Sequence, residues 1–188
     1  NGISPCPDET DNMVLTITTQ AIADAGPPAT ICAGSTYQLN GTVSNNSGFT
    51  WTTTTGGSFS AGIDPIYTPS QADINAGSVT LTLIANGISP CPDETDNMVL
   101  TITPQATTDA GPPATICAGS THQLNGTVNN NSGFTWTSPT GGSFSAGIDP
   151  IYTPSPADIN AGSVTLTLIA NGINPCPDVS DNMVLTIT

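Results

Sequence analysis

The sequence repeats itself with a period of 85 residues. Residues 86–170 match residues 1–85 at all but eight positions, and residues 171–188 begin the same motif a third time. Repetition on this scale decides the architecture before any local pattern is interpreted, because each copy is expected to form the same unit and to pack only against its neighbours. We therefore expect a segment of a longer tandem array, an architecture that suits a structural role better than a catalytic one.

The charge balance excludes nucleic acid as a partner, and the lack of a long apolar run argues against insertion into a membrane. The chain holds fourteen Asp and Glu residues, one His and no Lys or Arg, so that its formal net charge is −14 at pH 7. Because no Lys or Arg is available to neutralise phosphates, we expect no nucleic-acid partner. No run is long and apolar enough to cross a bilayer, so we expect no membrane insertion either.

Apolar and polar residues alternate along both copies. In Ser78–Ala85, Leu81 and Leu83 are separated by threonines, and the same alternation returns in Asp96–Thr103. A period of two is typical of half-buried β-strands, and turn residues separate about seven such strands in each copy. Only Ser70–Asp73 has a helix-start pattern, enough for one turn. These features predict an all-β fold of tandem β-sandwiches.

The domain boundaries follow from the same patterns. We expect residues 1–18 to be the closing strand of a preceding repeat, and residues 29–103 and 114–188 to be two complete domains. Residues 19–28 and 104–113 contain Gly-Pro-Pro and are predicted to be stiff linkers. Each core is expected to hold one tryptophan and the inward-facing leucines of the longest strand. These residues are Trp51, Leu81 and Leu83 in the first domain and Trp136, Leu166 and Leu168 in the second.

Four stretches carry a resemblance to a known family. They are ICAGSTYQLNGTV, FTWTTTTGGSF, PIYTPSQADINAGSVTLTLIANG and CPDETDNMVLTIT. Together they resemble the immunoglobulin-like or PKD-like repeats of very large surface proteins from the Bacteroidetes, including gliding and adhesion proteins. The resemblance implies export to the bacterial cell surface and a structural role in a stalk, an adhesin shaft or a filament.

Two functions are open at this point. One is a structural module, whose partners are the neighbouring identical repeats and other copies in a filament. The other is an adhesion module that binds a glycan or a protein through its loops or a sandwich face. We expect no enzymatic activity, because the single histidine, His122, is replaced by Tyr37 in the other copy and the abundant Ser and Thr residues lack a base.

Cysteines recur once per motif, which indicates an oxidising, extracytoplasmic compartment. The favoured pairing lies within the domains and joins Cys32 to Cys91 and Cys117 to Cys176, leaving Cys6 for a domain outside this segment. A second pairing joins Cys6 to Cys32 and Cys91 to Cys117, and a third joins Cys32 to Cys176. The favoured pairing has one difficulty. The first and last turns of an ordinary seven-strand sandwich lie at opposite ends, whereas a disulfide needs Cα atoms within about 7 Å.

Carboxylates gather in the turn before each closing strand and in the segment before each domain. Hard oxygen ligands at a domain junction suit Ca²⁺, while the plainer interpretation is an acidic turn that keeps the chain in solution. We expect no cofactor and no other metal, with Ca²⁺ as the alternative. The candidate ligands are Asp24, Asp93, Glu94 and Asp96, followed by Asp109, Asp178 and Asp181.

Overall fold

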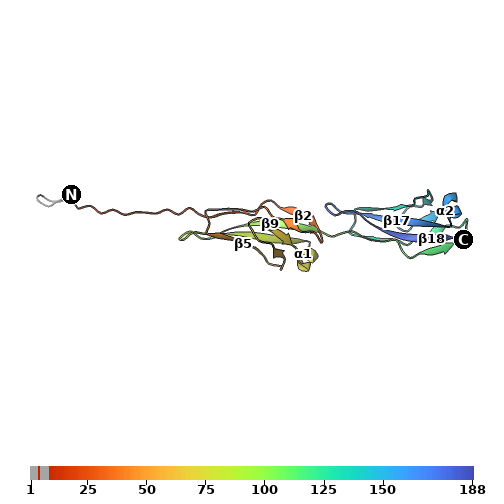
Figure 1. Ribbon diagram of the computed structural model, residues 1–188, viewed down its shortest axis with the longest axis horizontal. Helices are drawn as coiled ribbons and strands as arrows, with labels where there is room; N and C mark the ends of the chain where they lie inside the picture. Colours follow the sequence, from red (N-terminus) through yellow and green to blue (C-terminus); the bar gives the residue numbers. More distant parts are fainter. Residues whose placement is uncertain (1–3, 5–8) are drawn as a thin grey trace.

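The computed structural model describes Ser4 and residues 9–188, and its two domains lie end to end along one long axis (Figure 1). Each domain is a β-sandwich with one short helix, so the predicted all-β fold class is confirmed. Within the described part of the chain, no helix is long and apolar enough to span a membrane.

The first domain runs from β1 to β9. One face is a four-stranded sheet in the order β2-β9-β8-β5, and the other is a three-stranded sheet in the order β3-β7-β6, with β1 and β4 forming a separate pair. Its elements are β1 (Ile22–Asp24), β2 (Ala29–Cys32), β3 (Tyr37–Gln38), β4 (Thr42–Ser44), β5 (Gly48–Thr53), β6 (Ser58–Phe59), β7 (Ile66–Thr68), α1 (Gln71–Ala76), β8 (Ser78–Asn86) and β9 (Glu94–Thr103).

The second domain repeats this arrangement element for element. Its sheets have the orders β11-β18-β17-β14 and β12-β16-β15, with β10 paired to β13. Its elements are β10 (Thr107–Asp109), β11 (Ala114–Ile116), β12 (His122–Gln123), β13 (Thr127–Asn129), β14 (Gly133–Thr137), β15 (Ser143–Phe144), β16 (Ile151–Thr153), α2 (Pro156–Ala161), β17 (Ser163–Asn171) and β18 (Val179–Ile187).

The predicted linkers are shorter in the structure. Residues 22–24 form β1, which pairs antiparallel with β4, and residues 107–109 form β10, which pairs with β13. Both strands therefore belong to the sandwiches, and the expected linkers 19–28 and 104–113 are wrong in their extent. Only residues 104–106 connect β9 to β10. Three-residue strands show no alternation that a sequence pattern could reveal.

The core of each domain lies between its two sheets. All six residues expected there are buried, with the four leucines fully inaccessible. The Trp51 indole packs toward Phe59, with ring centroids 6.3 Å apart, and Phe59 contacts Tyr67 at 4.9 Å. The indole nitrogen of Trp51 donates a hydrogen bond of 2.8 Å to the carbonyl oxygen of Ile63. The single polar group of this tryptophan is thereby satisfied inside the core.

The segment Asp11–Thr18 does not form the strand that its sequence predicts. It carries the same eight letters, DNMVLTIT, as Asp96–Thr103 and Asp181–Thr188, yet it extends away from the first domain (Figure 1). Met13 is 86% exposed, whereas its counterparts Met98 and Met183 are buried. The difference arises because β8 and β17 supply the neighbouring strand for the other two copies, whereas among the described residues no strand pairs with residues 11–18.

Candidate functional site: the junction between the domains

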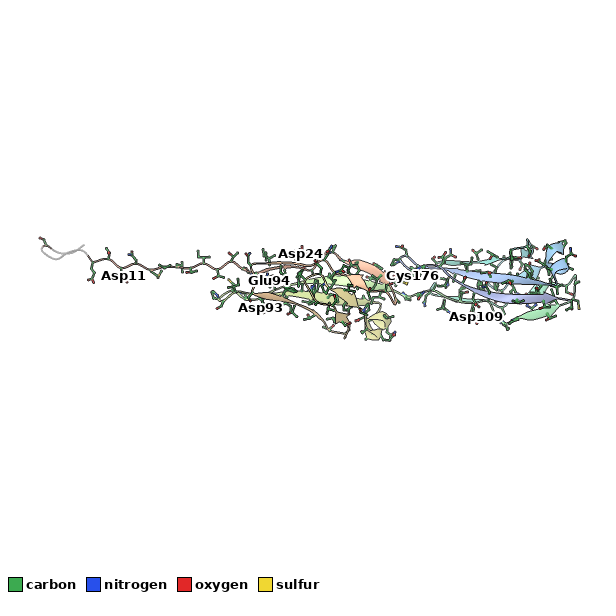
Figure 2. The ribbon with its side chains drawn as sticks, viewed as in Figure 1. Asp11, Asp24, Asp93, Glu94, Asp109 and Cys176 are labelled. Carbon is green, nitrogen blue, oxygen red and sulfur yellow. A yellow bond between two sulfur atoms is a disulfide. The ribbon has the colours of Figure 1, made fainter. Side chains whose placement is uncertain are left out.

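The direction of β2 places a cysteine at the junction. β2 runs parallel to β9, and its last residue, Cys32, lies opposite Thr103 at the end of the first domain that faces the second. The turn between β17 and β18 holds Cys176 and faces the first domain from the other side (Figure 2). Two cysteines that are far apart in sequence therefore meet across the three-residue connection.

A disulfide joins Cys32 to Cys176, with a Cα–Cα distance of 4.8 Å and a sequence separation of 144 residues. The favoured within-domain pairing is therefore wrong in this structure, and the third pairing is the one formed. The physical reason is that the first and last turns of one sandwich lie at opposite ends, too far apart for a disulfide. Cys91 lies in the β8–β9 turn at the opposite end of the first domain, where its Sγ is 3.3 Å from the carbonyl oxygen of Thr18.

The two copies show how the junction covers its cysteines. Cys32 and Cys176 are 8% and 7% exposed. Their counterparts are Cys117, which is exposed, and Cys91, which is half-buried, and both are unbonded. Local sequence is nearly the same around each pair, so the neighbouring domain accounts for the difference. Cys6, which the second pairing would use, lies outside the described residues.

The connection itself is held closely against the disulfide. The Sγ atom of Cys176 lies 3.4 Å from the carbonyl oxygen of Thr103 and 3.6 Å from that of Pro104. Ala106, two residues further along, is 3% exposed. A short, partly buried connection beside a covalent bond leaves little freedom for one domain to rotate against the other.

The candidate calcium ligands serve as acceptors for backbone N–H groups. Asp96 accepts from the N–H of Ala25 at 2.8 Å, which ties the closing strand to the bend between β1 and β2. Glu94 accepts instead from the side-chain amide of Gln20 at 3.0 Å. The remaining backbone pairs, at 2.8–2.9 Å, are Asp24 with Gly26, Asp93 with Gly87, Asp109 with Gly111, Asp178 with Gly172 and Asp181 with Ala110. Within residues 9–188 no three of these carboxylates come together as a metal site.

A buried aspartate in each domain was missed as a site by sequence reasoning. Asp73 is inaccessible and accepts hydrogen bonds from the Tyr67 hydroxyl at 2.8 Å, from the backbone and side chain of Ser70 at 2.7 and 2.8 Å, and from the Thr55 hydroxyl. Asp158 repeats the arrangement. The Ser-x-x-Asp pattern predicted the helix start, and the capping box is present. Nothing in that pattern pointed to the more distant hydroxyls.

The ionisation of this network is fixed by its donors. Burial raises the pKa of Asp73, but the hydrogen bonds from Thr55, Ser70 and Tyr67 outweigh it and hold the pKa below its ordinary value. Burial and the hydrogen bond to Asp73 raise the pKa of Tyr67 to about 12. A carboxylate that is fully occupied and a phenol that keeps its proton offer neither a base nor a nucleophile, so the network is structural.

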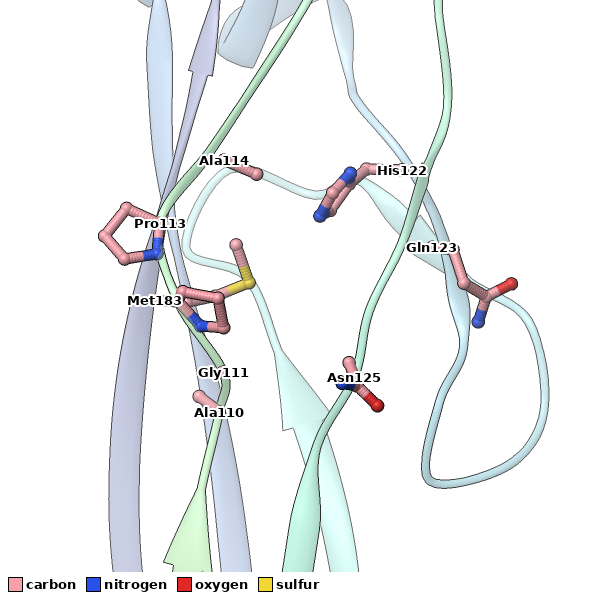
Figure 3. A pocket seen from close by; sticks show the side chains of 9 residues that line it. Ala110, Gly111, Pro113, Ala114, His122, Gln123, Asn125 and Met183 are labelled. Carbon is pink, nitrogen blue, oxygen red and sulfur yellow. The ribbon is translucent and has the colours of Figure 1, made fainter.

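A shallow hollow of about 190 Å³ lies on the second domain (Figure 3). His122, Gln123 and Asn125 line one side, and Met183 lies opposite them. The lining contains no carboxylate that could orient or charge the imidazole. Its volume is below the roughly 300–1,000 Å³ of ordinary small-molecule sites, so the hollow offers little to a ligand.

Comparisons with known proteins give the fold and no family. No protein-family model matches the sequence, and none of the curated proteins matches it. Among solved structures, the I-band fragment I67–I69 of titin superposes with a TM-score of 0.53 at 10% identity, covering 91% of this chain and 66% of that one. The fold is a tandem of immunoglobulin-like domains. An E-to-A variant of titin I67–I69 gives a TM-score of 0.51 at 11% identity and covers 89% and 65% of the two chains. Our chain thus spans just under two thirds of the length of these titin fragments.

Proposed function

We propose that this chain is a structural repeat module that supplies length and stiffness to an extracellular stalk, adhesin shaft or filament. The observation that carries the proposal is the disulfide between two successive domains. A bond inside one domain would stabilise that domain alone. A bond across the junction fixes the orientation of neighbours, which is useful when the product is a rod.

Other features support the same proposal. The connection between β9 and β10 is three residues long, and the buried carboxylates, the hydroxyls of Tyr67 and Tyr152 and the tryptophan nitrogens are engaged in internal hydrogen bonds. The partners we propose are neighbouring repeats of the same kind. We propose no enzymatic activity, no bound metal and no nucleic-acid partner.

An extracellular location, and more specifically the bacterial cell surface, is part of the proposal. Disulfides persist in oxidising compartments, and the resemblance of the four stretches named above to Bacteroidetes surface repeats supports the cell surface. The sequence also lacks Lys and Arg, so trypsin-like proteases have no cleavage site in it.

The unbonded cysteines provide the test, because Cys91 and Cys117 mark the outer ends of the two-domain rod. With Cys6→Ser to remove a third thiol, maleimide spin labels at these positions are expected to give one narrow distance distribution near about 70–80 Å, the height of two stacked sandwiches. A broad distribution or one centred far below this range would contradict a stiff rod.

The matched control removes the junction bond and leaves the labels in place. In the Cys32→Ser, Cys176→Ser double variant, we expect the same mean distance with a broader distribution, because the covalent restraint is gone. A glycan array with the unlabelled protein tests the alternative of an adhesion module, and reproducible binding there would favour that alternative over the scaffold.

A further inference from the structure

The junction disulfide changes which part of the chain carries a pulling force. Without it, tension applied at the two ends of the chain passes through every residue. With it, tension reaches Cys32 through β1 and β2, crosses to Cys176, and leaves through β18. Residues 33–175, which contain most of both sandwiches, lie in a closed loop outside this path.

The segments that remain in the path are already extended. Residues 18–32 cross the first domain from its outer end, where Thr18 contacts Cys91, to the junction, where Cys32 lies opposite Thr103. Residues 176–188 cross the second domain from the junction to its far end. A strand rises about 3.3 Å per residue, close to the limit of an extended chain. Little length is therefore available in these segments even if they detach from their sheets.

We propose that the Cys32–Cys176 disulfide is a load-bearing link that lets tension bypass the folded domains, so that the array resists extension without relying on the strength of its sandwiches. This inference rests on the proposed structural function and names the bond and the strands that perform it. The function that we assign to this bond is to carry mechanical load along the chain axis.

The unbonded cysteines extend the link into a repeating device. Cys117 occupies in the second domain the place of Cys32, and Cys91 occupies in the first the place of Cys176. With the pairing repeated every 85 residues, Cys117 joins the closing-turn cysteine of a following repeat, and Cys91 joins the opening cysteine of a preceding one. Residues 91–117 and the disulfides at their two ends then belong to a second load path, which alternates with the path through Cys32 and Cys176. In each path, every stretch of chain between two disulfides crosses two domains.

Each link forms by ordinary thiol–disulfide chemistry. One cysteine thiolate attacks a sulfur of a small-molecule disulfide and expels one thiolate, and the second cysteine thiolate then attacks the mixed disulfide and expels the other. The two protein thiols lose two protons and two electrons in total. The small-molecule disulfide accepts the electrons and leaves as two thiols.

Single-molecule stretching of the whole chain from its two ends tests the proposal. Roughly 500 Å of extended chain lie between Cys32 and Cys176. In the oxidised protein, we expect no domain-sized lengthening before the attachment breaks. After reduction, we expect two unfolding steps of about 250 Å each. Domain-sized steps in oxidised protein whose Cys32–Cys176 bond has been verified by peptide mapping would overturn the proposal.

Two double variants show which pair of cysteines prevents the domain-sized lengthening. Cys32→Ser with Cys176→Ser should give the two steps without any reductant, whereas Cys91→Ser with Cys117→Ser should leave the oxidised trace unchanged. Reduced wild type that lengthens gradually, without steps, would also overturn the proposal, since no folded domains would then be sheltered. The label distance described above is independent of these results. A stiff rod that unfolds domain by domain while oxidised would refute the bypass and leave the scaffold standing.

Discussion

The carboxylates of Asp73 and Asp158 lie buried in a chain that has no Lys or Arg to pair with them. Hydroxyl and backbone N–H donors replace the missing cations, and Tyr67 of β7 and Tyr152 of β16 donate to the same carboxylates. A buried ion without a counter-ion is tolerated only when such donors occupy its lone pairs. Each network fixes the start of a helix and the position of a strand at once.

Replacing the Asp73 carboxylate by an amide is expected to destabilise the first domain. In Asp73→Asn, the new NH₂ group faces hydroxyl and backbone donors, so at least one buried donor loses its acceptor. We expect a loss of about 2–3 kcal/mol in the free energy of unfolding of the first domain, measured by urea denaturation. Glu9→Gln, which makes the same chemical change at an exposed position, should be neutral. Equal effects of the two variants would contradict this role for the network.

The same networks set the range of pH over which the protein is most stable. Because the folded pKa of each buried Asp is lowered, its contribution is present above the unfolded value near 4 and is lost as the pH falls through the folded pKa. The Tyr67 and Tyr152 pKa values are raised to about 12, so their contribution is present below about pH 10 and is lost as the pH rises toward 12. Denaturation midpoints across pH should form a plateau between these limits. Phenolate absorbance of Tyr67 and Tyr152 appearing near pH 10 in folded protein would refute the alkaline limit.

Calcium is expected to have no effect on stability. The seven candidate carboxylates each accept a hydrogen bond from a backbone or amide donor, and in the part of the chain that the structure describes no three of them come together as a metal site. Melting temperatures in millimolar Ca²⁺ and in chelator should agree within about one degree, since a ligand that does not bind the folded state cannot stabilise it. A saturable rise in melting temperature with Ca²⁺ would show that a site exists after all.

At the scale of elements, a glycine explains why residues 36–43 form two strands and not one. Residues 36–43 alternate as a single strand should, but the structure forms β3 and β4 with Gly41 between them. A Cβ at Gly41 would lie 2.6 Å from the Trp51 indole and 3.0 Å from Leu83. The chain therefore passes close to the core at this residue and leaves the three-stranded sheet of β3 for the pair that β4 forms with β1, and only a residue without a side chain permits the approach.

Adding that side chain should destabilise either domain. For Gly41→Ala, and likewise for Gly126→Ala in the second domain, we expect a loss of roughly 1–3 kcal/mol from overpacking against the tryptophan, measured by denaturation. Gly133→Ala is the control, since a Cβ there meets nothing within 4 Å. A neutral Gly41→Ala would mean that the core relaxes more easily than its close packing implies.

The elements that sequence reasoning predicted well are those with a strong local pattern. β8 and β9 begin and end within two residues of the predicted Ser78–Ala85 and Asp96–Thr103, because nine or ten alternating residues leave no other interpretation. β1 and β10 were assigned to linkers because three residues show no period. The sequence leaves three cysteine pairings open, because the choice among them depends on the parallel pairing of β2 with β9. No local pattern records which end of a sandwich a short strand reaches.

At the scale of the whole molecule, comparing the two copies of the repeat shows what the neighbouring domain contributes. Two nearly identical sequences fold into the same elements in the same order, and they differ in exposure where the structure places the other domain beside them, as Cys32 and Cys117 show. The comparison separates what a domain does alone from what its neighbour adds. Each sandwich completes its own core, and the neighbour adds the covered cysteines and the covalent bond.

Peptide mapping of the oxidised protein tests this account most directly. Free thiols are blocked in acid, and a protease that cleaves at Asp replaces trypsin. The two copies can be told apart because Tyr37 is replaced by His122 and Ser89 by Asn174. We expect one cross-linked species that joins the Tyr37 peptide, which carries Cys32, to the Asn174 peptide, which carries Cys176. Cross-links between the Tyr37 and Ser89 peptides and between the His122 and Asn174 peptides would place both bonds within the domains and contradict the junction.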